Sequence, residues 1–117
     1  MNKLIGFKAN AEKSGGSTGE ADQLIQQIAC TNDVALLAPL FARLDTASDL
    51  LGWSGDCDYA AIALQAALEQ AGTPKIREAM LGFALERARW CASCATSGGE
   101  GWARSMHVRE LEALTLN

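Results

Sequence analysis

The sequence predicts an all-α fold, a compact bundle of four to five helices with a flexible or partner-docked N-terminal arm. Alanine and leucine supply 21 and 15 of the 117 residues, whereas the strand formers valine and isoleucine together supply seven. Apolar residues recur at spacings of three and four positions in several segments. Glycine, proline and short polar residues separate these segments, and the length is typical of one domain.

Residues 1–16 are predicted to form an arm or tail outside the bundle. They place Leu4, Ile5 and Phe7 among charged residues and end in a glycine pair, which is typical of a flexible link. Because the apolar cluster can dock on a neighbour, we expect the arm at the periphery of the domain or donated to a partner. Residues 17–117 then form a single helical domain.

The first helix of that domain is predicted to begin at Ser17, because Ser17 and Glu20 fit a capping box. Five apolar positions follow at helical spacing, as expected of an amphipathic helix with one buried face. These positions are Ala21, Leu24, Ile25, Ile28 and Ala29.

The second helix is predicted to follow a cap at Asn32 or Asp33. Pro39 removes an interior hydrogen bond, so either the helix kinks there or a short first turn precedes a helix that restarts at the proline. A third helix, over about 57–71, is predicted after a cap at Asp56. Its scarcity of polar positions predicts a central place in the bundle.

The fourth and fifth helices complete the predicted bundle. Thr73 followed by Pro74 is typical of a cap with proline at the first helical position, so the fourth helix is expected from 74 to about 95. A Thr-Ser-Gly-Gly run ends it, and a weakly amphipathic fifth helix is predicted over 100–114.

The charge and hydropathy patterns argue against several function classes. The formal net charge is −4, and lysine and arginine do not outnumber the acids in either half of the chain, so we expect no binding to nucleic acid or membranes. No apolar run approaches the roughly 20 residues of a membrane span. The first 16 residues lack the apolar core of a secretory signal, which predicts a cytoplasmic protein with reduced cysteines. No cofactor is predicted.

Cys91 and Cys94 form the motif with the most chemical character. On a helix both sulfurs would lie on one face, so the pair could serve redox chemistry or, with His107, bind a metal. A redox pair needs a helix N-terminus, whereas this pair lies toward a C-terminal end, and a metal site needs ligands beyond one histidine. Buried packing cysteines are the favoured interpretation.

The same Cys-x-x-Cys spacing on a helix resembles that of helical peroxidase-reductases of the alkylhydroperoxidase D type. In that family a histidine follows the second cysteine by four residues, and Gly98 occupies this position here. The resemblance covers a short stretch and lacks the proton-relay group, so it implies no residue roles in this chain.

Arg87 is predicted to lie in an apolar stripe of the fourth helix, with Met80, Phe83 and Trp90. A guanidinium in such surroundings must be paired or extend to solvent. One interpretation is that Arg87 projects into a cavity or subunit interface and binds a carboxylate of a ligand or partner chain. The other, favoured because buried charges are normally paired, is an ion pair within the chain. The acids considered for that pair are Asp45, Asp49 and Asp58.

The segment from Trp53 to Tyr59 is the best sequence candidate for a pocket rim, because it gathers an aromatic platform, two acids and a thiol. The simpler interpretation is favoured: Asp56 and Asp58 stabilise the start of a helix while Trp53 covers the end of the bundle.

The function predicted from the sequence is that of a non-catalytic cytoplasmic interaction module, homodimeric, of adaptor, inhibitor or immunity type. The apolar faces of the second and fourth helices are expected to meet another chain. One alternative is a helical protein that holds a small apolar or carboxylate ligand in an internal cavity. A second is a thiol-redox or metal enzyme that uses Cys91 and Cys94, with His107 as a further ligand. The residues expected at a ligand or partner contact are Arg87, Trp90, Phe83, Met80, Trp53 and Tyr59.

Overall fold

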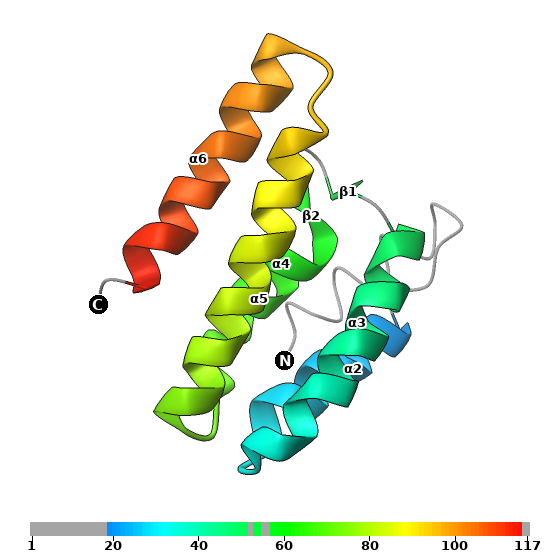
Figure 1. The fold of residues 1–117 in the computed structure, drawn as a ribbon, viewed down its shortest axis with the longest axis vertical. Helices are drawn as coiled ribbons and strands as arrows, with labels where there is room; N and C mark the ends of the chain where they lie inside the picture. Colours follow the sequence, from blue (N-terminus) through cyan, green and yellow to red (C-terminus); the bar gives the residue numbers. More distant parts are fainter. Residues whose placement is uncertain (1–18, 52, 55–56, 116–117) are drawn as a thin grey trace.

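The computed structural model describes residues 19–51, 53–54 and 57–115, and within this part of the chain the predicted all-α fold is confirmed. Two antiparallel helix pairs, α2 with α3 and α5 with α6, lie around a short central helix, α4 (Figure 1). The predicted arm at 1–16 and the cap at Ser17 lie outside the described residues.

Helix α2, Gly19–Cys30, shows how closely the apolar spacing anticipated burial. All five apolar positions that define its predicted stripe are buried, which confirms the amphipathic assignment. Asp22 is also buried on this helix, where its carboxylate accepts a hydrogen bond of 2.6 Å from the hydroxyl of Tyr59. The pair ties α2 to the start of α4.

The proline of the second predicted helix is accommodated without a kink in the helix interior. A 3-10 turn, η1 at Val34–Leu36, is capped by Asp33, and α3 then runs over Leu37–Leu51. Pro39 is therefore the third residue of α3, where a backbone N–H has no partner within the helix. Of the two alternatives, the short turn followed by a new helix is correct, although α3 begins two residues before the proline.

The third predicted helix is shorter than expected and starts later. Residues Trp53–Ser54 (β1) and Cys57–Asp58 (β2) form a small antiparallel pair, and α4 covers only Tyr59–Ala66 before a 3-10 turn, η2, at Leu68–Gln70. Asp58 is the cap of α4, because its carboxylate accepts from the backbone N–H of Ala61 at 3.1 Å. The expected cap at Asp56 was wrong.

The predicted central place of α4 is confirmed by its burial. Half of its eight residues are alanines or leucine with no exposed surface, which lets α5 and α2 approach closely. The helix positions its N-terminal Asp58 deep inside the molecule, where the site described below begins.

The last two helices follow the predicted boundaries closely. Thr73 caps α5, Pro74–Ser93, by accepting from the N–H of Ile76 at 3.2 Å, and proline is the first helical residue. Helix α6, Gly98–Thr115, runs back along α5 (Figure 1). Among the described residues, no helix combines the length and hydropathy needed to cross a membrane.

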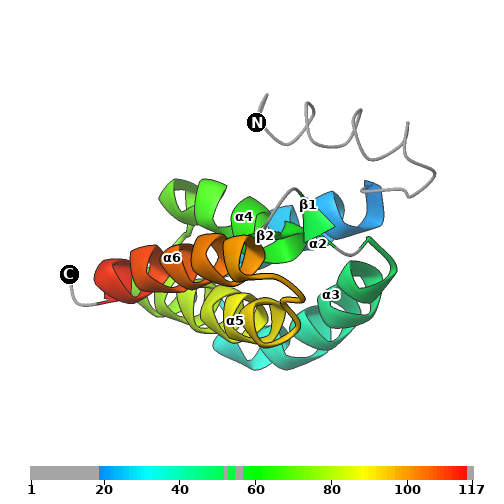
Figure 2. The ribbon, with the colours of Figure 1, turned by 90° about the horizontal axis from the view of Figure 1, so that it is seen from above.

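The helices form two layers, with α3 and α5 on one side and α2 and α4 on the other (Figure 2). Helix α5 packs on α6 and α4, whereas α3 packs mainly on α2. Helices α3 and α5 therefore face each other across a gap that side chains bridge, and this gap contains the candidate site.

Candidate functional site

A groove of about 320 Å³ lies at the surface between α3 and α5. Helical spacing places its residues on facing sides, since positions 83, 87 and 90 share one face of α5 and positions 41, 45 and 49 share one face of α3. The groove is lined by Asp45, Asp49, Phe83, Glu86, Arg87 and Trp90.

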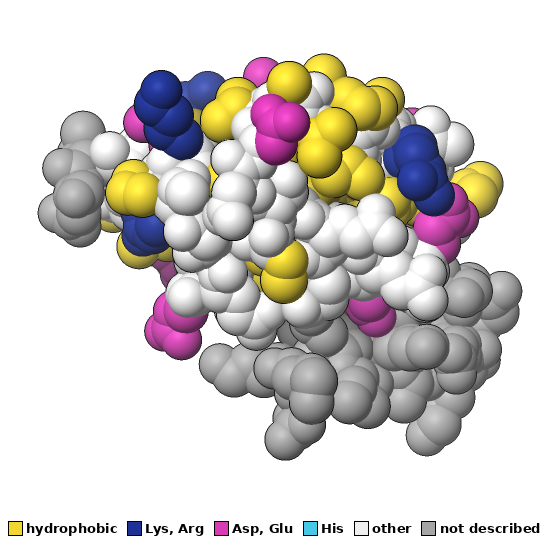
Figure 3. Space-filling model, turned by 90° about the horizontal axis from the view of Figure 1, so that it is seen from below, with side chains coloured by type: hydrophobic (Ala, Val, Ile, Leu, Met, Phe, Trp, Pro, Cys, Tyr) yellow, Lys and Arg dark blue, Asp and Glu magenta, His cyan; other side chains and the backbone are white. Residues whose placement is uncertain are grey.

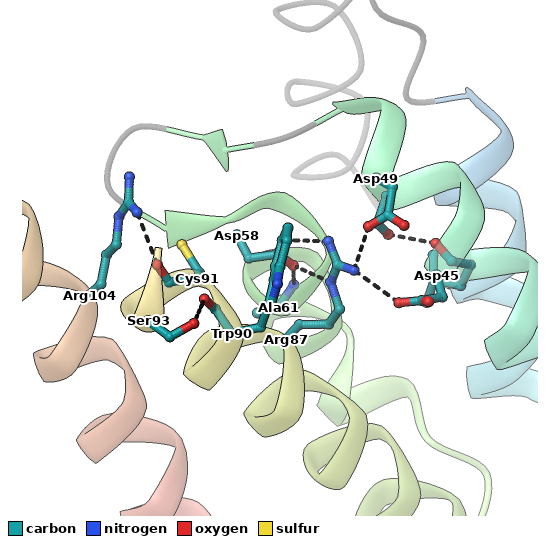
Figure 4. Close-up of polar contacts among 11 residues, drawn as sticks. Asp45, Asp49, Asp58, Ala61, Arg87, Trp90, Cys91, Ser93 and Arg104 are labelled. Atoms are coloured by element: carbon teal, nitrogen blue, oxygen red, sulfur yellow. Dashed lines mark hydrogen bonds and ion pairs between the residues drawn. The ribbon is translucent and has the colours of Figure 1, made fainter. Parts of the chain in front are cut away.

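Arg87 occupies the middle of this site and binds three carboxylates of its own chain (Figure 4). Its Nε and Nη2 donate to the two oxygens of Asp58 at 3.2 and 2.8 Å, in a bidentate arrangement. Its Nη1 donates to Asp45 and Asp49, each at 2.9 Å. The intrachain ion pair considered from the sequence is therefore present, and all three candidate acids take part.

The inner carboxylate, Asp58, is completely buried and has two structural tasks. It caps α4 through Ala61 and neutralises Arg87, which is itself 7% exposed. Burial by itself would lower the pKa of Arg87, but the hydrogen bonds to Asp58, Asp49 and Asp45 raise it above its usual value. The guanidinium therefore stays charged, and its N–H groups are committed to these acids.

The outer part of the site carries a surplus of negative charge. The side chains of Asp45 and Asp49 are 53% and 56% exposed, and Glu86 is exposed beside them. With Asp58, four acids surround one arginine, so the cluster has a formal charge of −3. Because Asp58 and Arg87 are buried, the surface exposed to a binding partner is acidic.

Aromatic side chains adjoin the acidic rim. The ring of Trp90 lies 4.9 Å from the Arg87 guanidinium carbon, in a cation–π contact, and the residue remains 46% exposed. Phe41 of α3 and Phe83 of α5 stack with ring centroids 4.7 Å apart and planes at 17°. The groove thus offers an aromatic surface next to carboxylates.

The structure brings together only part of the residue set expected at a binding site. Arg87, Trp90 and Phe83 line the groove, but Met80 is fully buried in the core. Tyr59 is buried too, and its hydroxyl faces Asp22.

The predicted rim segment contributes to this site through Asp58, but not through Tyr59. The backbone of Trp53 pairs with Asp58 across β1 and β2, while its side chain lies outside the described part of the structure. Asp58 acts as a cap, in agreement with the simpler interpretation of the segment.

The two cysteines of the Cys-x-x-Cys motif have different environments. Because α5 ends at Ser93, Cys91 is buried within the last turn, while Cys94 caps the helix and is exposed. Burial raises the pKa of the Cys91 thiol to about 11, despite the nearby positive charge of Arg104. The favoured interpretation of buried packing cysteines is therefore confirmed for Cys91 and wrong for Cys94. Cys91 is a poor thiolate nucleophile or metal ligand.

His107 is held inside the molecule by a polar partner. Its Nε2 lies 2.9 Å from Oε1 of Gln65, and burial lowers its pKa although Glu110 and Asp58 act in the opposite direction. Within residues 19–51, 53–54 and 57–115, no group of three or more His, Cys, Asp or Glu side chains is arranged to hold a metal ion.

Two residues of structural weight were not singled out from the sequence. Glu86 lies on the rim of the groove, and its signal was its place three residues after Phe83 and four before Trp90. Arg104 is buried between α5 and α6 and donates to the carbonyl oxygen of Cys91 at 2.9 Å. Its signal was its place on the same helical face as two other buried residues, at positions 107 and 111.

Comparison with known proteins gives no further guide to this site, because no family model, curated protein or solved structure matches the chain.

Proposed function

We propose that this protein is a non-catalytic binding module that engages another protein chain through the groove between α3 and α5. The observation that carries the proposal is the composition of that groove: three rim carboxylates, only one partly offsetting arginine, and an exposed tryptophan. Such a surface suits a basic and apolar segment, because complementary charge guides the encounter and an aromatic residue supplies contact area.

The partner in this proposal is a second copy of the chain, so the protein acts as a homodimer. Hydrophobic side chains gather at the edge of the lower face that lies nearest α5 and α3, between charged groups (Figure 3). On both helices apolar residues such as Leu40 and Ala79 are only partly buried, and Phe41 of α3 stacks on Phe83 of α5. A contiguous apolar surface with a charged rim is typical of a protein contact.

A cytoplasmic location belongs to the same proposal and rests on the cysteines. Cys30, Cys91 and Cys94 are free thiols. Thiols persist in reducing compartments, whereas secreted domains of this size commonly carry disulfides.

The alternatives gain less support from the geometry. A carboxylate ligand would have to compete with Asp45, Asp49 and Asp58 for the Arg87 guanidinium. A thiol or metal mechanism would have to use Cys91, whose raised pKa and burial oppose ionisation. A protein-binding role requires neither displacement of these carboxylates from Arg87 nor ionisation of Cys91.

The test is the oligomeric state of the full chain, measured by sedimentation velocity over a wide range of protein concentration. We expect a dimer that Glu86→Lys weakens by about tenfold or more, since the substitution reverses a rim charge and tenfold corresponds to about 1.4 kcal/mol. Glu69→Lys is the matched control, because Glu69 is exposed in η2, outside the groove, and should leave the dimer unchanged. A protein that is monomeric at every concentration, or a dimer that both variants affect equally, would overturn the proposal.

A further inference from the structure

We propose that the groove between α3 and α5 binds the lysine-rich segment 1–16 of a second copy of the chain, so that each copy donates its segment to the other. This inference rests on the proposed function and names the part of the partner that fills the groove. It follows from the charge of the groove, the composition of the segment, and the position of α2 in the fold.

The charge of the chain is divided between this segment and the rest. Residues 1–16 contain Lys3, Lys8 and Lys13 against the single acid Glu12, a formal charge of +2. Since the whole chain has a formal charge of −4, residues 17–117 carry −6. The segment thus holds three of the four lysines of the protein within its first 13 positions. A strongly unequal distribution of this kind favours contact between the two parts.

The groove presents its acids where a lysine can reach them. Asp45 and Asp49 follow one another by one turn of α3, and Glu86 lines the same groove from α5. The charge of Arg87 is balanced by Asp58 behind it, so the three rim acids leave the cluster with its formal charge of −3. An ammonium group placed among the rim carboxylates therefore meets net attraction and ready hydrogen-bond acceptors.

The apolar part of the segment matches the apolar part of the groove. Leu4, Ile5 and Phe7 all lie between Lys3 and Lys8 in the sequence. In the groove, the exposed indole of Trp90 and the Phe83 ring adjoin the carboxylates. A segment that alternates lysine with apolar residues can satisfy both features at once, which neither an acidic segment nor a purely polar one can do.

The fold favours a second copy over the same chain as the donor. The described chain begins at Gly19 with α2, which lies in the layer behind α3 and α5, and the groove is formed by the front layer (Figures 1 and 2). A segment of the same chain would have to pass around α3 to enter the groove. Exchange between two copies avoids that path and gives a closed, two-fold symmetric dimer with two identical contacts.

The first experiment reverses the lysines in the full chain. The variant Lys3→Glu/Lys8→Glu/Lys13→Glu should raise the dimer dissociation constant at least about tenfold, because it places three acids opposite the acidic rim. The control, Arg43→Glu/Lys75→Glu/Arg109→Glu, makes the same change in net charge at exposed positions outside the groove lining. It should dimerise like the parent chain when both are measured by sedimentation velocity at equal salt.

The decisive experiment combines two weakened variants. Glu86→Lys/Asp45→Asn makes the groove less acidic while keeping an oxygen acceptor for Arg87, and its own segment 1–16 retains its lysines. Mixed with the triple-glutamate variant, it should form a heterodimer tighter than either homodimer. In the mixed species, the lysine segment meets the unchanged acidic groove, and the glutamate segment meets a groove whose three rim positions sum to zero charge instead of −3. One contact is therefore restored and the other loses its charge repulsion.

The outcomes separate this inference from the proposed function. If the dimer persists, loses affinity with Glu86→Lys, and is indifferent to the three lysines, the groove is the interface and the segment is not its occupant. If the mixture shows no preference for the heterodimer, exchange of the segment between copies is overturned. If the parent chain stays monomeric throughout, both this inference and the proposed homodimer fail.

Discussion

Two arginines on facing helices are both buried, yet their surroundings differ. Arg87 lies between α5 and α3, and its charge is met by three carboxylates at 2.8–2.9 Å. Arg104 lies between α6 and α5, where it donates to the carbonyl oxygen of Cys91 and has one carboxylate, Glu100, at 3.8 Å. The first region has more negative charge than its arginine requires, while in the second a single acid accompanies the arginine.

The difference distinguishes a candidate binding site at Arg87 from a purely structural contact at Arg104. At Arg104 the helices pack directly, and the guanidinium links the end of α5 to the start of α6. At Arg87 the helices are held apart, the partners come from two elements besides α5, and the acids extend to the surface. Surplus charge at a surface opening is available to a partner, whereas a balanced buried contact serves the fold.

The largest expected effect is the loss of the Arg87 cluster. Arg87→Met should lower the free energy of unfolding by about 3–5 kcal/mol, because it leaves Asp58 charged, buried and without its guanidinium. Urea unfolding at one fixed protein concentration measures this loss.

The control for Arg87 lies on the same helix. Arg89→Met removes an exposed pair with Glu112, 3.0 Å long, and should cost about 0–1 kcal/mol. Equal losses from the two substitutions would contradict the structural weight assigned to the cluster.

Thiol reactivity tests whether the Arg104 side of α5 is closed. Three pH units below the raised pKa of about 11, only about one Cys91 thiol in a thousand is ionised, and the residue is buried. Iodoacetamide should therefore label Cys94 well before Cys91, as followed by peptide mass mapping, and unfolding in urea should remove the difference. Similar labelling rates in the folded protein would show that this side is open.

The Arg104 contact should matter less than the Arg87 cluster. Arg104→Met removes the guanidinium hydrogen bond to the carbonyl of Cys91, which then retains the backbone N–H of Cys94 at 3.2 Å. The expected cost is about 1–3 kcal/mol in urea unfolding. The same variant should keep the dimer affinity of the parent chain, since Arg104 does not line the groove. A loss larger than that of Arg87→Met would reverse the comparison.

The smallest expected effect is a pH dependence at His107, on the α6 side. Burial lowers the pKa of His107, so the unfolded chain binds the proton more readily than the folded one. The contribution of neutral His107 to the free energy of unfolding is therefore fully present above pH 6.5, the ordinary pKa of histidine, and is lost as the pH falls below it. His107→Gln should reduce this slope in urea midpoints measured on both sides of that pH, and an unchanged slope would assign it to other groups.

The helices were largely predictable, and the groove was not. Each helix except α4 appeared within a few residues of its expected bounds, because capping by residues such as Thr73 and the stripe of α2 act between near neighbours. The start of α4 was missed by the choice between two nearby acids, Asp56 and Asp58. The β1 and β2 pair places Asp58 directly before α4, and strands of two residues are too short to show a sequence pattern.

For the site, the sequence supplied the participants but not their arrangement. The isolated position of Arg87 among apolar residues showed that it needed partners, and Asp45, Asp49 and Asp58 were available. Periodicity could not show that all three would bind it, nor that Met80 would be buried away from Phe83 and Trp90. It also placed Cys91 and Cys94 together, although the end of α5 at Ser93 separates their environments.

The sequence by itself determined the helical class, the cap at Thr73, and the need to neutralise an arginine on an apolar face, and it narrowed the earlier cap to Asn32 or Asp33. Only the tertiary structure decided that Asp58, Asp49 and Asp45, which precede Arg87 by 29, 38 and 42 positions, would meet it at a surface groove. Helix formation depends on contacts within one turn, and those are written in local spacing. Partners across helices depend on which faces pack, and packing is set by the whole core at once.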